Sequence, residues 1–310
     1  MQAPGSPAMP SHPTACASTL TPQESEVQNA VLALYGGQGA SAEQQRAANT
    51  YLQDFAQAPA AWNISLALLE KLTGPGASSV QFFAANMLYT KVRREWAAMA
   101  ADECARLSTT LLQLLRRAKS ATQPVFEEQV QRRICLALAA ASLHSVDACK
   151  AFIQEAISLA GNTAGVGGAA VAADAAPPTV VSVTVALEML NALPEEKRNA
   201  GISVERKREL EKQLCGCASH VLALCDHVAP VLVEQQAQAP LMQLLQNWVE
   251  ACQISLTRLQ SQHGTTFQAV LLTFSQPPGG QSKFLQRAAS VLTALLAVLE
   301  QPRPPGRAVF

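Results

Sequence analysis

The chain has 310 residues, of which 49% are apolar, 15% charged and 5% aromatic, so a sizeable core of small and aliphatic side chains is expected. Lys plus Arg and Asp plus Glu both number 23, so no global field attracts nucleic acid or an anionic membrane. Lys, Arg, Glu, Gln or Pro interrupts each apolar run before the roughly 18 residues needed to cross a bilayer. We therefore expect a soluble protein that binds neither nucleic acid nor membrane directly.

Helical periodicity runs through almost every segment from residue 21 onward. About twelve helices are expected, near residues 24–35, 42–57, 60–73, 78–97, 101–118, 124–144, 146–160, 179–193, 204–227, 240–260, 265–275 and 282–300. Ser41 suits an N-cap, whereas Pro59 and Pro124 suit first-turn positions. Residues 179–185 could instead form a strand, but with no second strand to pair with, a β-branched helix start is favoured.

The expected helices come in pairs at roughly the 40 to 47 residue period of helical hairpin repeats. One hairpin buries too little surface alone, so stacking must supply the core. The prediction is all-α: a HEAT-repeat-like α-solenoid over residues 21–300, a right-handed superhelix of about six antiparallel helix pairs. Residues 161–178 are expected to form a flexible low-complexity loop, residues 1–20 a disordered leader and residues 301–310 a disordered tail. A single helical bundle is the main alternative fold.

Two expected helices each carry a polar stripe opposite an apolar face. In helix 78–97 the core face holds Val80, Phe83, Ala84, Met87, Leu88 and Val92, extended by Phe82, Ala85, Tyr89 and Trp96, and the stripe holds Asn86, Thr90 and Arg93. In helix 124–144 the core face holds Phe126, Val130, Ile134, Ala137 and Leu138, opposite Glu128, Gln129 and Arg132. Such stripes are either solvated surface or partner-facing.

Residues for catalysis or metal binding do not converge in the sequence. The five His residues are scattered, and neither HExxH nor a phosphate-binding GxxxxGK[ST] loop occurs, so no catalytic residue, cofactor or metal is assigned. A zinc site of Cys217, His220, Cys225 and His227 is disfavoured, because Cys215 and Cys217 have CxC spacing and no second cluster completes the ligands. The eight Cys residues are interpreted as reduced core thiols, although a helical enzyme that uses a Cys or His remains an alternative.

A basic run at 197–208 is balanced by interspersed Glu residues, which favours ion pairing on a helix over RNA binding or a nuclear signal.

Several strings occur in a characteristic order along the chain. They are VLALY at 31–35, ANTYLQDF at 48–55, Trp62, VQFFAANML at 80–88, Trp96 and VQRRICLAL at 130–138. In this order the sequence resembles the amino-terminal region of the importin-beta superfamily, the karyopherins. LEMLNALPEE at 187–196 is similar to the transportin-SR and importin-thirteen branch.

The resemblance implies a nuclear transport receptor that shuttles between cytoplasm and nucleus, carries protein cargo past nucleoporins and is switched by the small GTPase Ran in its GTP form. It implies that the two polar stripes, Asn86, Thr90, Arg93, Glu128, Gln129 and Arg132, face Ran. A HEAT scaffold unrelated to transport is the alternative. Members are usually about three times longer, and the apolar helix expected at 282–300 lacks the polar face of a terminal repeat. We therefore expect a fragment, a short isoform or a truncated gene model.

Overall fold

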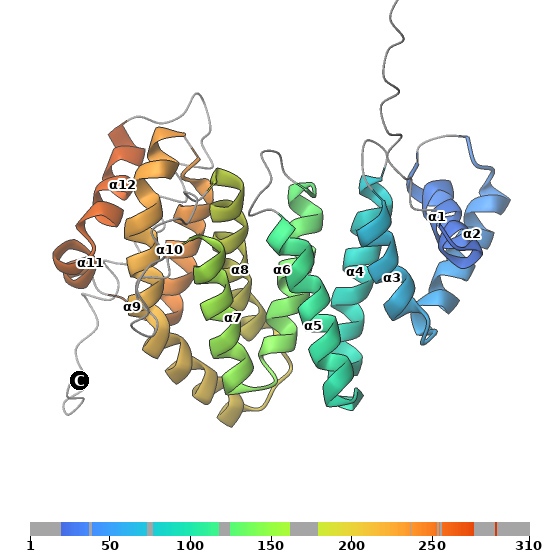
Figure 1. The fold of residues 1–310 in the computed structure, drawn as a ribbon, viewed down its shortest axis with the longest axis horizontal. Helices are drawn as coiled ribbons and strands as arrows, with labels where there is room; N and C mark the ends of the chain where they lie inside the picture. Colours follow the sequence, from blue (N-terminus) through green and yellow to red (C-terminus); the bar gives the residue numbers. More distant parts are fainter. Residues whose placement is uncertain are drawn as a thin grey trace, which may run out of the picture. The chain divides into compact units, whose positions relative to one another are not determined.

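The computed structural model describes residues 20–36, 39–72, 77–117, 125–161, 179–235, 237–252, 254, 256–275 and 289. Within these residues the regular elements are helices, with no strand, which confirms the all-α class (Figure 1). The expected leader, the loop at 161–178, the helix at 282–300 and the tail lie almost entirely outside the described residues. The chain divides into two compact units, Met1–Val80 and Gln81–Phe310, with the division inside the first turn of α4 (Ser78–Glu95).

The first unit contains α1 (Pro22–Tyr35), α2 (Ala42–Gln57) and α3 (Ala61–Lys71), which pack against one another. Ser41 caps α2 as expected, since its hydroxyl accepts the N–H of Gln44 at 3.2 Å. Pro59 lies in the turn before α3 rather than in its first turn.

Glu24 joins two helices of this unit. In a capping box at the start of α1, its carboxylate accepts the N–H of Thr21 at 2.8 Å while its own N–H donates to the Thr21 hydroxyl. The carboxylate also binds Nζ of Lys71, at the end of α3, at 2.8 Å. Although burial raises the pKa of Glu24, the hydrogen bonds from Lys71 and Thr21 outweigh it, and the net pKa is lowered.

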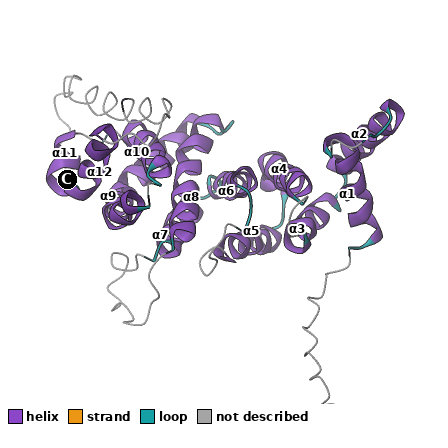
Figure 2. Cartoon of the chain, turned by 90° about the horizontal axis from the view of Figure 1, so that it is seen from above, coloured by secondary structure: helices purple, strands orange, loops and turns teal. Residues whose placement is uncertain are grey.

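The second unit contains the remaining helices. They are the rest of α4, a 3₁₀ turn η1 (Trp96–Ala98), α5 (Ala101–Arg116), α6 (Glu128–Ser142), α7 (Val146–Leu159), α8 (Val180–Asn199), α9 (Val204–Glu234), α10 (Ala239–Cys252), α11 (Leu256–Gln262) and α12 (Gly264–Ser275). From α5 to α10 each helix packs against its neighbours in the chain, and α6 with α8, α8 with α10, and α7 with α9 also pack side by side. The pairs α5/α6, α7/α8 and α9/α10 therefore stack in two layers (Figure 2), as a HEAT-like solenoid requires and a single bundle does not.

Residues 180–185 are helical, as favoured over a strand. The Thr179 hydroxyl caps α8 by accepting the N–H of Ser182 at 3.1 Å, and the Thr184 hydroxyl donates to the carbonyl of Val180 at 2.8 Å. Local hydroxyl bonds thus support a helix at a β-branched sequence.

Four expected boundaries are wrong. Helix α6 begins at Glu128 rather than 124, because Glu127 is extended and occupies the N-cap. Helices α8 and α9 continue through Pro194 and Pro230, where ends were expected at 193 and 227. The helix expected at 240–260 is broken between α10 and α11, where the N–H of Ile254 bonds to the carbonyl of Val249, five residues earlier.

Helix α8 passes Pro194 because another helix replaces the missing donor. Pro194 has no N–H for the carbonyl of Leu190, four residues earlier. The indole Nε1 of Trp248, on α10, donates to that carbonyl at 2.9 Å instead. The tertiary contact satisfies the acceptor that proline leaves free.

Helix α9 is long and apolar enough to cross a membrane by length and composition, contrary to the expectation for apolar runs. Its buried residues include Leu210, Leu214, Val221 and Leu224, and the helix packs against α7, α8, α10 and α12. These contacts are those of the core helix of a folded unit.

Candidate partner-binding surface

Helix α4 has the core face expected of it. Val80, Ala84, Leu88 and Val92 are fully buried, Met87 is nearly so, and Phe83 is half-buried. Of the expected polar stripe, Asn86 and Thr90 are half-buried and joined on the helix by a bond from the Thr90 hydroxyl to the Asn86 carbonyl at 2.9 Å, whereas Arg93 is exposed.

Lys91 also lies on α4 and was not expected in the core. Its side chain is only 2% exposed, and its Nζ pairs with Glu95, one turn later, at 2.8 Å. A lysine is rarely buried without such a partner, because removing the ammonium from water is costly.

Arg93 reaches from α4 to the end of α8. Its Nη2 donates to the carbonyl of Asn199 at 3.0 Å, and its Nε lies 3.9 Å from Oε2 of Glu196. Its Nη1 donates to the hydroxyl of Tyr89 at 3.3 Å, and the guanidinium lies 5.6 Å from the centre of the Tyr89 ring. Arg93, which the sequence analysis assigned to the polar stripe, therefore joins α4 to α8.

Arg132, on α6, likewise forms bonds to α8. Its guanidinium binds Glu188 at 2.9 Å and Glu195 at 2.6 Å, two carboxylates spaced seven residues apart on α8. Burial and the neighbouring Glu195 and Glu128 raise the pKa of Glu188, while Arg132 opposes the shift. Glu128 and Gln129, the other two expected residues of this stripe, are exposed in the first turn of α6.

Together these side chains form what we call the α4–α6–α8 polar cluster. It consists of Tyr89, Arg93, Arg132, Arg133, Glu188, Glu195 and Glu196. Arg133 stacks over the rings of Phe82 at 5.8 Å and Tyr89 at 5.4 Å, which completes the link from α6 to α4. The cluster combines guanidinium donors, carboxylate acceptors and aromatic faces, which are groups suited to binding a polar protein surface.

Glu196 is the least satisfied member of the cluster. Its side chain is 1% exposed, the Tyr89 hydroxyl donates to Oε1, and Oε2 has no hydrogen-bond donor among the described residues. Burial raises the pKa of Glu196, although Tyr89 and Arg93 oppose the shift, and burial together with the Glu196 carboxylate raises the pKa of Tyr89.

Polar contacts continue from α8 to α10. Arg198 donates to Glu250 at 3.2 Å and to Oδ1 of Asn247 at 3.3 Å, and Nδ2 of Asn247 donates to Oδ1 of Asn191 at 3.2 Å. Side-chain contacts therefore link α4, α6, α8 and α10 to one another.

The structure thus brings Arg93 and Arg132 into one cluster through α8. The polar stripes did not point to Tyr89, which was assigned to the apolar face, or to the three Glu residues of α8. The spacing of Glu188 and Glu195 could have signalled a shared face, since residues seven apart on a helix align.

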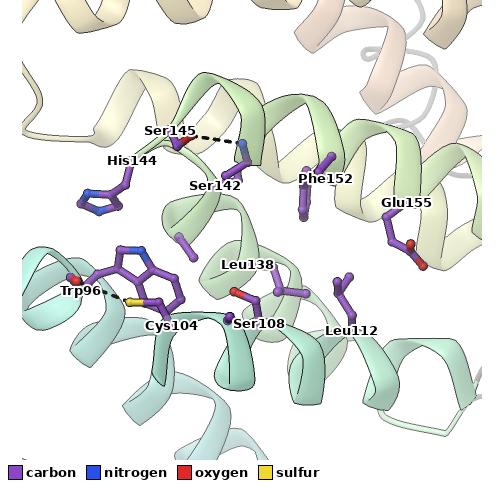
Figure 3. Close-up of a pocket in the computed structure, with 14 residues that line it drawn as sticks. Trp96, Cys104, Ser108, Leu112, Leu138, Ser142, His144, Ser145, Phe152 and Glu155 are labelled. Carbon is purple, nitrogen blue, oxygen red and sulfur yellow. Dashed lines mark hydrogen bonds between the residues drawn. The ribbon is translucent and has the colours of Figure 1, made fainter. Parts of the chain in front are cut away.

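A separate cavity of about 390 Å³ lies between α5, α6 and α7 (Figure 3). Trp96, Cys104, Leu138, His144 and Phe152 are among its lining residues, and the Cys104 thiol donates to the Trp96 carbonyl at 3.8 Å. Burial raises the pKa of Cys104, and burial together with Arg206 lowers the pKa of His144. A protonated thiol near a neutral imidazole is not an activated nucleophile.

The zinc hypothesis finds no cluster in the part of the chain that the structure describes. There, no three His, Cys, Asp or Glu side chains gather as metal ligands. His220 and His227 are exposed, whereas Cys225 is buried.

Comparison with known proteins gives one family match. No curated protein matches the chain. Residues 48–117, from the middle of α2 to the end of α5, match the family described as the importin-beta N-terminal domain. This segment contains the whole of α4, including Arg93 and the buried core face of that helix. The match covers 70 of the 310 residues, and the chain is similar to this domain over that segment.

Proposed function

We propose that the chain is a nuclear transport receptor of the importin type, or the amino-terminal portion of one, that binds the GTP form of Ran and carries protein cargo through nuclear pores. The match of residues 48–117 to the importin-beta N-terminal domain carries the proposal, because that domain is known to bind Ran in its GTP form. Contacts with nucleoporins and shuttling between cytoplasm and nucleus belong to the same proposal, as does a non-enzymatic role. Placement in the transportin-SR and importin-thirteen branch is a finer proposal that rests mainly on LPEE at 193–196 and the basic helix that follows it.

The polar residues of α4 and α6 support a Ran-facing surface. Arg93 is 40% exposed and Arg132 is 42% exposed, so each guanidinium keeps donors available for a partner while it binds α8. Glu128 and Gln129 are exposed next to Arg132 in the sequence, at the start of α6. A partner surface with both charge signs would complement this arrangement.

The ion pairs suggest how binding could change the array. Arg132 ties α6 to α8, and Arg198 ties α8 to α10. A partner that bonds to one of these guanidinium groups in place of its Glu partner would weaken that salt bridge between helices. It would thereby favour a different packing of the helix pairs. Ran would then act on cargo affinity if each partner prefers a different packing.

The test is a binding assay of the full chain with Ran loaded with GTP or GDP. We expect binding of the GTP form, weakened when Arg93→Ala or Arg132→Ala removes a donor of the polar cluster. Arg106→Ala is the matched control, because Arg106 on α5 is 72% exposed and pairs only with Asp102 and Glu103 of its own helix among the described salt bridges. Binding that ignores the nucleotide, or that falls equally for Arg106→Ala, would contradict the proposal and favour a scaffold role.

A further inference from the structure

Three basic side chains line one cavity at the junction of α8, α9 and α10. These helices pack against one another (Figure 2), and the cavity has a volume of about 370 Å³. Its basic lining residues are Lys197 and Arg198, in the last turn of α8, and Lys207, near the start of α9. The other lining residues are two apolar residues and two carboxylates, namely Pro194, Ala251, Glu211 and Glu250. The volume falls within the range of small-ligand sites, about 300–1,000 Å³.

The Lys197 ammonium is incompletely paired. Its side chain is only 14% exposed, so much of its hydration is lost. Its ion-pair partner, Oε2 of Glu211, lies 3.6 Å from Nζ, whereas a charge-assisted hydrogen bond is about 2.7–2.9 Å long. The Glu211 side chain is 52% exposed, so its carboxylate can return to water at small cost. Lys197 is therefore available to bind an anion in the cavity.

The two other basic residues add positive charge to the same cavity. Lys207 is half-buried, lies one turn before Glu211 on α9, and forms no ion pair with any residue that the structure describes. Arg198 is 52% exposed and binds Glu250 at 3.2 Å. Because Arg198 already offsets Glu250, only Glu211 opposes the charges of Lys197 and Lys207. The lining residues thus carry one positive charge in excess.

We propose that this cavity binds a small phosphate monoester through Lys197, Lys207 and Arg198. At neutral pH such an ester carries a charge of about −1.5 to −2. At equal distance it attracts an ammonium up to about twice as strongly as the single charge of Glu211 does, so it displaces that carboxylate. A carboxylate or a phosphodiester has one charge and only competes with Glu211 on equal terms. The two apolar lining residues contact the organic group of the ester.

The first experiment tests the class of ligand by isothermal titration calorimetry of the full chain, with phenyl phosphate as the probe and ionic strength held constant. We expect saturable one-to-one binding with a dissociation constant of about 1 mM or below. The diester methyl phenyl phosphate lacks the second charge, and inorganic phosphate lacks the apolar group, so each should bind at least about threefold more weakly. No saturable binding of phenyl phosphate up to about 10 mM, or equal binding of the monoester and the diester, would overturn the proposal.

The second experiment tests the site with variants of its lining residues. Lys197→Met keeps the apolar stem but removes the ammonium, and Lys207→Ala removes the second cation, so each should weaken binding of phenyl phosphate about tenfold. Glu211→Gln removes the competing carboxylate and should tighten binding at least about threefold, a gain that a folding defect cannot produce. Lys212→Ala is the matched control, because Lys212 is exposed on α9 and does not line the cavity. Equal losses for Lys207→Ala and Lys212→Ala, or weaker binding by Glu211→Gln, would refute the assignment.

Discussion

The bond between Trp248 and the carbonyl of Leu190 makes a quantitative prediction about how α8 tolerates a proline. Trp248 is 1% exposed and supplies the donor that Pro194 cannot. In Trp248→Phe the carbonyl loses its donor, and an unsatisfied buried acceptor costs about 1–3 kcal/mol. The smaller ring also buries less apolar surface, which adds about 1–2 kcal/mol. The single variant should thus lose about 2–5 kcal/mol of stability.

Pro194→Ala restores an N–H that can bond to the same carbonyl. In this background Trp248→Phe should cost only the packing part, so the two substitutions should couple by about 1–3 kcal/mol. Urea unfolding followed by far-UV circular dichroism gives the four free energies. Trp96→Phe is the control and should not couple to Pro194→Ala, because the half-buried Trp96 of η1 donates no indole hydrogen bond to any residue that the structure describes. Additive effects of Trp248→Phe and Pro194→Ala would refute the reasoning.

Three further predictions concern stability. Leu88→Ala removes a fully buried side chain of α4 and should cost about 2–5 kcal/mol in urea unfolding, whereas a loss below about 1 kcal/mol would place Leu88 outside the core. Because the pKa of Glu24 is lowered, its contribution is complete above the ordinary value of 4.5 and is lost as pH falls through the folded pKa. The melting temperature of the wild type should therefore fall relative to Glu24→Gln below about pH 4.5, and a constant difference would contradict this. The pKa of Glu196 is raised, so its ionisation opposes folding. The wild type should therefore gain stability relative to Glu196→Gln as pH falls from neutral toward 4.5. A loss of relative stability over that range would show that folding lowers the pKa of Glu196 instead.

The periodic apolar pattern was sufficient to predict the helices and their buried faces. Val80, Leu88, Val130 and Ile134 are buried as their spacing indicates. The ends at Pro194 and Pro230 were mispredicted, because local rules end a helix where proline removes a hydrogen bond. At Pro194 the replacement donor comes from Trp248, 58 residues later in the chain, and no local pattern reveals such a partner.

Of the contacts in the candidate surface, only the arginine partners could be predicted from the sequence. Arg93 and Arg132 stand out as polar residues on apolar helices, so their positions follow from the helical period. The two carboxylate partners of Arg132 lie 56 and 63 residues later in the chain, on a helix whose residues are mostly buried.

The most direct measurement for the proposed function is a titration of the full chain against Ran charged with a non-hydrolysable GTP analogue and, separately, with GDP. The account predicts saturable one-to-one binding of the GTP form and at least tenfold weaker binding of the GDP form, a difference of about 1.4 kcal/mol. Equal affinity for both forms, or no binding of either by a chain whose circular dichroism is helical, would contradict it.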